Sequence, residues 1–281
     1  MPGFFAFAFF RPILYTSNYR MSELDNNNTS VVEENSASQS PAIDPALLDE
    51  MVKAGILYGR KKSKTHPRMK PFVFATRNGI EILEVAKTVI ALEKAGDFLR
   101  DLAQKDGMIL VVGTKPVSQS LMEDFAKNFS FPYVTKRWLG GTLTNFKTIS
   151  KRLQYYMTLK ADRVTGKLEK YTKKERVEFD KIIERMNGFF LGLERLTRIP
   201  DAILVVNAND HITAIREARR MKVPVVAVLS TDTDPEIVEY PIPANDNSRA
   251  SVTWVLAKLA AKIEEGRKNR VVTPAPVVAP K

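Results

Sequence analysis

Short apolar segments recur along the chain and are separated by stretches with helical spacing. The apolar segments are PFVFAT (71–76), MILVVGT (108–114), FPYVT (131–135), AILVVNA (202–208) and VPVVAVLS (223–230). Three of them are continuous rather than alternating, which is typical of strands buried on both faces. The helical stretches cover residues 85–104, 118–128, 211–221 and 248–266. Because helices alternate with strands, the pattern predicts a doubly wound α/β domain around a parallel sheet with right-handed crossovers.

The alternation stops between Gly141 and Pro200, where no buried-strand segment occurs. Apolar residues instead fall at helical spacing on both sides of a turn-like segment, DRVTGK (162–167): Phe146, Ile149, Leu153, Tyr156 or Met157, then Phe179, Ile182, Met186, Phe189, Leu193 and Leu196. The second set follows steps of three and four residues, which is the spacing of a coiled-coil seam. The segment is therefore predicted to be an antiparallel helical hairpin, a coiled coil inserted into the α/β domain.

These patterns divide the chain into predicted parts. Residues 1–40 form a disordered N-terminal extension, because residues 21–40 are too polar to bury a core. The α/β domain is discontinuous, 41–141 and 199–270, and opens with a helix that Asp44 caps and that ends near Gly55. The hairpin covers 142–198, and 271–281 is a flexible Pro/Val-rich tail.

The first twenty residues, MPGFFAFAFFRPILYTSNYR, contain two arginines and no acid. Three interpretations are open: a disordered extension, a start that lies too far upstream with Met21 as the true initiator, or an organellar transit peptide. The localisation prediction follows from this choice. It is cytoplasmic in the first two cases and organellar if residues 1–20 are a transit peptide.

Charge is the unusual quantity in the composition. The chain holds 43 Lys and Arg against 32 Asp and Glu, a net charge of +11, and the segment 142–198 alone holds 14 against 7. Such an excess favours a polyanionic partner, nucleic acid or an acidic membrane surface. No apolar run approaches the ~18 residues needed to cross a bilayer, so the protein is predicted to be soluble or at most peripheral, and a membrane is not among its predicted partners. There is no cysteine, which excludes disulfides and thiol chemistry.

Motifs for catalysis are weak, and we predict no enzymatic activity, no cofactor and no metal. The loop VVGTKPVS follows a strand but lacks the glycine spacing of a phosphate cradle. It is interpreted as a strand-to-helix turn capped by Ser118. The two histidines, His66 and His211, lie far apart in sequence. We expect His211 to be an exposed residue in the first turn of a helix.

Clusters of basic residues give the stronger functional signal. The segment RKKSKTHPRMK contains no acid and provides Arg60, Lys61, Lys62, Lys64, Arg68 and Lys70. Cations at this density repel one another unless a polyanion lies alongside, and phosphate contacts release counterions. The alternative interpretation is a solvated loop. Arg77 closes the following strand and extends the cluster.

A second candidate is KRWLGGTLTN (136–145). Lys136 and Arg137 are predicted to contact phosphates, whereas Trp138 either stacks on a base or packs in the core. Gly140 and Gly141 form the hinge into the hairpin, and Thr142 or Thr144 caps its first helix. The predicted RNA-binding set is completed by Lys115 and Lys147.

Three blocks resemble the family of the second protein of the small ribosomal subunit, bacterial or organellar type: KRWLGGTLTNFKTI (136–149), PDAILVVNANDHITAIREARRMKVPVVAV (200–228) and HPRMKPFVFATRNGIEIL (66–83). The similarity covers roughly residues 44–266. It implies a Rossmann-like three-layer domain with a coiled-coil hairpin, and a structural constituent of the small ribosomal subunit without enzymatic activity. The implied partners are small-subunit rRNA, neighbouring ribosomal proteins and, in some bacteria, the large mRNA-binding protein of that subunit.

The chain departs from the family pattern at three positions. Leu57 and Arg60 stand where histidines are common, so any contact or ion site that needs those imidazoles is open to question. His211 stands where the family usually has an acid.

Two other classes of function compete with the ribosomal one. They are an enzyme that binds a phosphorylated ligand at the carboxyl ends of the strands, and a scaffold that binds partners through the 179–196 seam.

Overall fold

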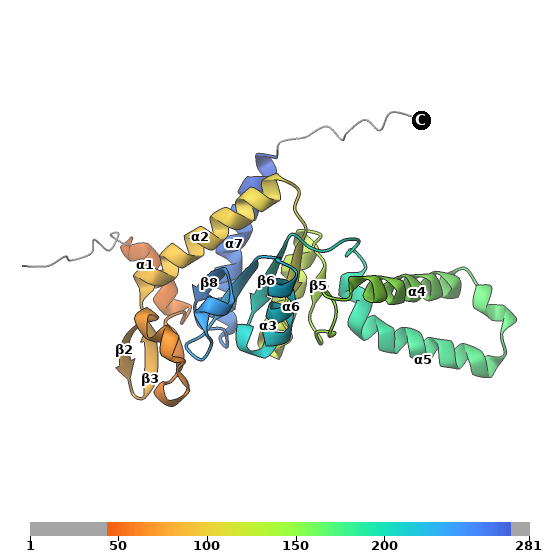
Figure 1. Cartoon of the computed structure of the whole chain (residues 1–281), viewed down its shortest axis with the longest axis horizontal. Coiled ribbons are helices and arrows are strands. Elements are labelled where there is room, and N and C mark those ends of the chain that lie inside the picture. The colour runs from red at the N-terminus through yellow and green to blue at the C-terminus, as the bar shows by residue number, and fades with distance from the viewer. Residues whose placement is uncertain (1–43, 271–281) are drawn as a thin grey trace, which may run out of the picture. The chain divides into compact units, whose positions relative to one another are not determined.

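The computed structural model describes residues 44–270. Its centre is a five-stranded parallel sheet with the strand order β5-β4-β6-β7-β8 (Figure 1). The strands are β4 (Ile109–Val112), β5 (Tyr133–Val134), β6 (Ala202–Val206), β7 (Val225–Leu229) and β8 (Tyr240–Pro243). The first strand of this sheet lies between the second and the third, so the order is a common doubly wound one. The predicted parallel α/β domain is confirmed.

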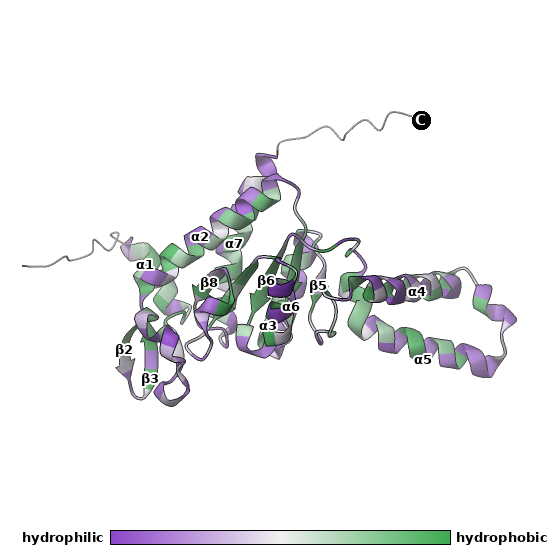
Figure 2. Cartoon of the chain, in the orientation of Figure 1, coloured by the Kyte–Doolittle hydropathy of each residue, from purple (hydrophilic) through white to green (hydrophobic). Residues whose placement is uncertain are grey.

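The two faces of the sheet pack against different helices. Residues such as Val111 face α2 (Val85–Gln104), α3 (Pro116–Asn128) and α7 (Arg249–Lys268). The alternate residues, such as Leu110, face a second apolar cluster, which includes α6 (Ile212–Arg220) and the base of the helical hairpin. Strand side chains alternate between faces, so a fully apolar strand fills both layers of core. Figure 2 shows the central strands of the parallel sheet, such as β6, as uniformly hydrophobic.

Predicted helix boundaries agree closely with the structure, with one correction. The helix α2 has the predicted limits, and α7 begins directly after its cap, Ser248. The helix α3, however, begins at Pro116, and Ser118 is a buried residue inside it that donates to the carbonyl of Lys115 at 3.2 Å. The prediction of Ser118 as the cap was wrong because proline fits the first helical turn and starts the helix earlier.

The sequence did not predict a second, antiparallel sheet or two of its three short strands, β1 (Tyr58–Lys61) and β3 (Ile80–Leu83). The segment 71–76 was predicted alongside the core strands, but β2 (Val73–Arg77) pairs antiparallel with β3 (Ile80–Leu83), which also pairs with β1 (Tyr58–Lys61). The strand β8 also escaped prediction, since two of its four residues are proline. Proline is tolerated there because β8 is an edge strand. The expected first helix is confirmed as α1 (Pro45–Lys53), capped by Asp44.

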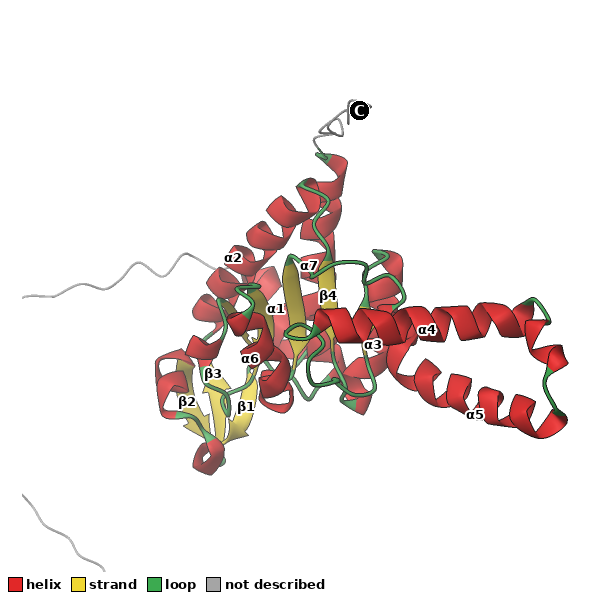
Figure 3. Ribbon diagram, turned by 45° about the vertical axis from the view of Figure 1, so that its right-hand side comes forward, coloured by secondary structure: helices red, strands yellow, loops and turns green. Residues whose placement is uncertain are grey.

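The predicted helical hairpin is present as α4 (Phe146–Val164) and α5 (Lys173–Phe190), which run antiparallel (Figure 3). The Tyr156 hydroxyl donates to Asn187 at 2.9 Å, and Arg163 lies 3.1 Å from Asp180. Tyr156 is buried whereas its neighbour Met157 is exposed, which decides the seam position that the sequence left open. The second helix begins with a capping box formed by Thr172 and Glu175.

The base of the hairpin is fastened to the edge strand β5. A methyl group added to Gly192, just after α5, would lie 2.2 Å from the carbonyl oxygen of Tyr133 in β5. The Tyr133 hydroxyl in turn donates to Glu123 of α3 at 3.2 Å. Only glycine permits this approach of the two backbones, so the position of the hairpin base depends on it.

The remaining predicted boundaries stay predictions. The extension 1–40 and the tail 271–281 lie outside the described residues. Within residues 44–270, every helix is too short or too polar to serve as a membrane span.

Candidate nucleic-acid interface

The carboxyl edge of the parallel sheet, where doubly wound folds usually bind ligands, is filled by the protein's own ion pairs. Arg60 of β1 reaches across to Asp246 at 2.8 Å and to Asp232 at 3.4 Å. The Asp246 side chain is only 1% exposed. Burial raises the pKa of this carboxyl group, while the Arg60 guanidinium acts in the opposite direction. Arg60 therefore compensates a buried charge, a role different from the phosphate contact expected of it.

Lys115 belongs to the same network. Its ammonium group lies 2.9 Å from Asp210 and donates to Asn247 at 3.3 Å. Arg60 also donates to Asn247, at 3.2 Å, so this one amide oxygen joins the two cations. Both predicted RNA contacts thus have protein partners in the structure.

His211 is buried beside this network, contrary to the expectation of an exposed residue. The backbone N–H of Thr114 donates to its Nε2 atom at 3.3 Å, and the side chain is 3% exposed. Burial lowers the pKa of His211 to about 4, with Asp210 acting to raise it and Lys115 to lower it. The imidazole is neutral at physiological pH and accepts a hydrogen bond. The sequence misled because the residue follows an acid in a polar loop, whereas the short helix before α6 turns it inward.

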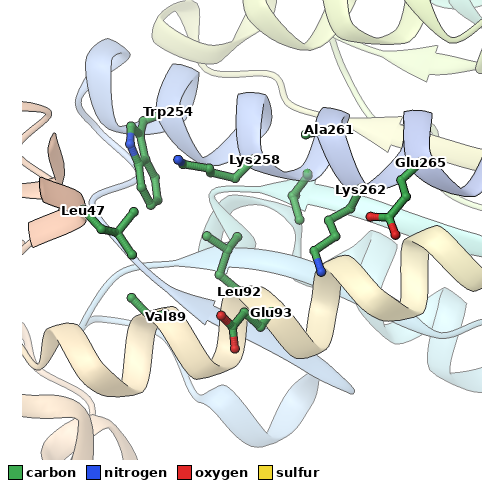
Figure 4. Close-up of a pocket in the computed structure, with 10 residues that line it drawn as sticks. Leu47, Val89, Leu92, Glu93, Trp254, Lys258, Ala261, Lys262 and Glu265 are labelled. Atoms are coloured by element: carbon green, nitrogen blue, oxygen red, sulfur yellow. The ribbon is translucent and has the colours of Figure 1, made fainter. Parts of the chain in front are cut away.

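A groove lies between α1, α2 and α7, as Figure 4 shows. It measures about 280 Å³ and is lined by apolar residues around Trp254 and Leu92. Its lysines are engaged with protein groups: Lys258 stands 5.1 Å over the Trp254 ring, and Lys262 lies 2.9 Å from Asp97. Among residues 44–270, no three His, Cys, Asp or Glu side chains gather closely enough to hold a metal ion. The groove offers no set of reactive groups.

The basic loop, defined here as residues 61–70, carries exposed cations in two short 3₁₀ helices, η1 (Lys62–Lys64) and η2 (Pro67–Phe72). His66 anchors it by donating its backbone N–H to the Thr231 carbonyl at 2.8 Å. Arg68 pairs with Asp234 at 2.7 Å and with Glu236 at 3.0 Å. Four exposed lysines have no carboxylate within 4.0 Å among the described residues: Lys61, Lys62, Lys64 and Lys70. Arg77, at the end of β2, is exposed in the same way.

The loop 136–145 is organised by an acid that the sequence did not single out. Glu217 of α6 is buried and accepts hydrogen bonds from the backbone N–H groups of Gly141 at 2.8 Å, Leu143 at 3.1 Å and Thr144 at 3.4 Å. The Trp138 indole N–H donates to the same carboxylate at 3.1 Å. Burial alone would raise the pKa of Glu217, but these donors together hold it below its ordinary value.

The hydrogen bonds of this loop show that the predicted cap of α4 was wrong, and the fold shows where Trp138 packs. The residue before α4 is Asn145, while the hydroxyl of Thr142 donates to Leu139 at 2.6 Å and that of Thr144 to Glu217 at 3.4 Å. Neither threonine caps the helix, because both hydroxyl groups are used to fold the loop. Trp138 is half-buried and packs against the apolar cluster, as the core alternative requires. The predicted hinge is therefore a segment folded by hydrogen bonds to Glu217.

The other basic residues of this region point to solvent. Lys136, Arg137 and Lys147 are exposed, and none has a carboxylate within 4.0 Å in the part of the chain that the structure describes. Glu217 was missed because acids on helices are usually exposed. A signal existed, since Glu217 shares a helix face with the buried Ala214 and Ala218.

Comparisons with known proteins identify the family of the chain. The family model described as Ribosomal protein S2 matches residues 51–266. The chain is 39% identical to the small ribosomal subunit protein uS2 of Thermus thermophilus over 230 residues, 82% of this chain and 90% of the relative. Identity to the uS2 protein of Coprothermobacter proteolyticus is 38% over 79% of this chain and 83% of the relative. For the protein of that name from Dehalococcoides mccartyi, identity is 36%, with 80% and 92% covered.

The fold and the site define a doubly wound α/β protein with a helical hairpin, exposed unpaired cations and a ligand edge closed by ion pairs. Its class is that of the ribosomal proteins. The chain belongs to the Ribosomal protein S2 family. Family membership confirms both the resemblance drawn from the sequence and the prediction that the protein is not an enzyme.

Proposed function

We propose that the protein is a structural constituent of the small ribosomal subunit that binds small-subunit rRNA through two groups of exposed cations. The first group is the basic loop with Arg77. The second is at the base of the hairpin and comprises Lys136, Arg137 and Lys147. Contacts of this kind position a protein on folded RNA through phosphates and shape rather than through sequence.

The observation that carries this proposal is the run of exposed, unpaired lysines in the basic loop. Within the described part of the chain, some exposed lysines elsewhere in the fold have an acid nearby, as Lys127 has Glu123 at 2.7 Å, and others such as Lys53 do not; the basic loop differs because its unpaired lysines are close together in one short segment. Lys61, Lys62 and Lys64 have none among residues 44–270. Unpaired like charges on one short loop repel each other, and a phosphate backbone relieves that repulsion and releases its counterions. The repulsion among these lysines is therefore lower beside the phosphates of RNA than in water alone.

Arg60, Arg68, Lys115 and Trp138 take a secondary part in this proposal, because protein groups already engage them. They hold the loops that present the free cations, and any phosphate contact they make is in addition to that role. Leu57, at a position where family members often have histidine, packs partly buried against the core.

The hairpin and its neighbours complete the proposal. We infer that α4 and α5 pack as an antiparallel coiled coil inserted at 142–198 into an α/β domain of 41–141 and 199–270. Exposed apolar side chains on the pair, such as Met157 and Val177, suit contact with neighbouring ribosomal proteins, among them the large mRNA-binding protein of the subunit. The proposed location is the cytoplasmic ribosome, or an organellar one if residues 1–20 are a transit peptide.

The experiment replaces Lys61, Lys62 and Lys64 together by alanine and follows incorporation into small subunits on sucrose gradients over a salt series. We expect weaker incorporation, with the slope of log affinity against log salt reduced by about two to three. The control removes the same charge from Lys53, Lys105 and Lys268, which are also exposed but lie outside the basic loop.

Two results would count against the proposal. One is incorporation of the loop variant equal to that of the unmodified protein at every salt concentration. The other is an equal loss in the control variant, which would show that only net charge matters. If the unmodified protein is absent from the small-subunit peak, the proposed function as a ribosomal constituent is wrong.

A further inference from the structure

The outer face of the small antiparallel sheet carries an aromatic and aliphatic surface between two unpaired cations. Residues directly opposite each other on antiparallel strands place their side chains on the same face. Ile80 of β3 lies opposite Lys61 of β1 on one side and Arg77 of β2 on the other. One row across the three strands therefore reads cation, aliphatic, cation.

The neighbouring row on the same face contains an aromatic ring. Ile82 lies opposite Tyr58 of β1 and Ala75 of β2. Tyr58 is 53% exposed and Ile80 39% exposed. A methyl group added to Gly55 would lie 3.7 Å from the Tyr58 ring, so the ring rests beside that glycine while much of it is open. The face thus offers an ordered aromatic surface.

A β-bulge explains why this face is free. The register of β1 against β3 shifts between Tyr58 and Lys61. Gly59 approaches Thr231, where an added methyl group would lie 2.5 Å from Cγ2, and Arg60 reaches Asp246. Both residues inside the bulge therefore face the α/β domain, and the two residues that flank it face the other way.

The cations beside Tyr58 indicate which kind of ligand this face binds. Lys61 and Arg77 have no carboxylate within 4.0 Å in residues 44–270, and the one acid of β3, Glu81, is buried on the opposite face, where the Thr65 hydroxyl donates to it. A surface that combines an open aromatic ring with flanking cations suits an unpaired nucleotide, whose base stacks while its phosphates meet the cations. An acidic peptide would use the cations but leave the ring without a planar partner.

We propose that the β1-β3-β2 face, centred on Tyr58, Lys61 and Arg77, binds unpaired nucleotides of RNA by stacking on Tyr58. This inference rests on the proposed rRNA-binding function and gives one of its surfaces a ligand class, single-stranded rather than duplex RNA. The exposed loop cations then bind phosphates of either form, whereas Tyr58 discriminates between them.

The test measures fluorescence anisotropy of two probes with the full chain: a labelled RNA oligonucleotide without self-complementarity, and the same RNA annealed to its complement. We expect Tyr58→Ala to weaken binding of the single strand by roughly 5- to 100-fold and to leave duplex binding unchanged. Tyr58→Phe retains the ring and should retain affinity. Tyr155→Ala removes a tyrosine of equal exposure, 53%, from α4 and should have no such selective effect.

The inference fails if the unmodified protein does not bind the single strand, if Tyr58→Ala binds it as the unmodified protein does, or if the loss is equal for both probes. It also fails if Tyr58→Phe loses as much as Tyr58→Ala. The lysine triple variant measured beside them separates the two proposals. If it loses both probes while Tyr58→Ala loses neither, the rRNA-binding function stands and the stacking face does not.

Discussion

The indole N–H of Trp138 donates to the carboxylate of Glu217 at 3.1 Å, which ties the loop before the hairpin to helix α6. The same carboxylate accepts from the backbone of Gly141 at 2.8 Å. One buried acid therefore serves donors from a segment more than seventy residues away in sequence. The joint between the sheet and the hairpin is thus a folded unit with an anionic centre, not a flexible linker.

Removal of this anionic centre is expected to destabilise the protein strongly. Glu217→Ala leaves buried N–H groups of the loop without an acceptor, so the free energy of unfolding should fall by about 2–4 kcal/mol. Urea unfolding measures the change. Glu178→Ala, at an exposed position of α5, is the control and should lie close to the unmodified protein. A small effect at Glu217 would mean that water replaces the carboxylate.

Trp138 is expected to matter for stability more than for RNA binding. Trp138→Phe removes the N–H donor but keeps most of the apolar ring, so we expect a loss of about 1–2 kcal/mol in unfolding free energy. Affinity for RNA should be unchanged in the anisotropy assay described above. An affinity loss of tenfold or more with stability intact would instead show that the indole stacks on RNA.

Two glycines at the two ends of the hairpin are expected to differ sharply on substitution. Gly192→Ala forces a methyl group against the Tyr133 backbone and should cost about 1–3 kcal/mol. At Gly140 an added methyl group has no neighbour within 4 Å among the described residues, so Gly140→Ala should be nearly neutral. Thermal unfolding of the two variants compares them directly. Equal melting temperatures would mean that the hairpin base shifts without cost.

We expect Arg60 to contribute more to the stability of the fold than to RNA binding. Arg60→Ala leaves the buried Asp246 without its counter-ion, which should lower the free energy of unfolding by about 2–4 kcal/mol. Replacing the acid as well, in Arg60→Ala with Asp246→Asn, should recover part of the loss because an amide needs no cation. Chemical unfolding of both single variants and the pair measures the coupling. If the second substitution adds its own full cost, the pair is not coupled.

Stability should depend on pH through His211. The folded state holds the imidazole neutral to about pH 4, whereas the unfolded chain binds a proton below about pH 6.5. Between these values the unfolded state binds more protons, so stability rises with pH, by roughly 2 kcal/mol between about pH 5 and pH 6.5. His211→Asn should flatten that profile. Because His66 remains in both proteins, identical profiles would show that His211 is not the titrating group.

The core of the fold could be predicted from sequence because its signals are local. Strand β6 reads as an apolar run, and α2 shows the helical period over its full length. The strands β3 and β8 could not, since Glu81 in the first and two prolines in the second interrupt the continuous apolar run that identified β4, a strand of the same length. Their pairing depends on segments far along the chain, which periodicity does not report.

For the candidate site, the positions of the dense cations and the family resemblance can be read from the sequence alone. Tertiary structure decided which cations are free. Arg60 and Lys115 look like Lys61 and Lys62 in the sequence, but acids brought in by the loops after β6, β7 and β8 neutralise the first two. Glu217 is a further example, because only the fold brings its carboxylate to the backbone N–H groups of the loop 136–145. A charge is visible in the sequence, whereas its partner depends on contacts that only folding brings together.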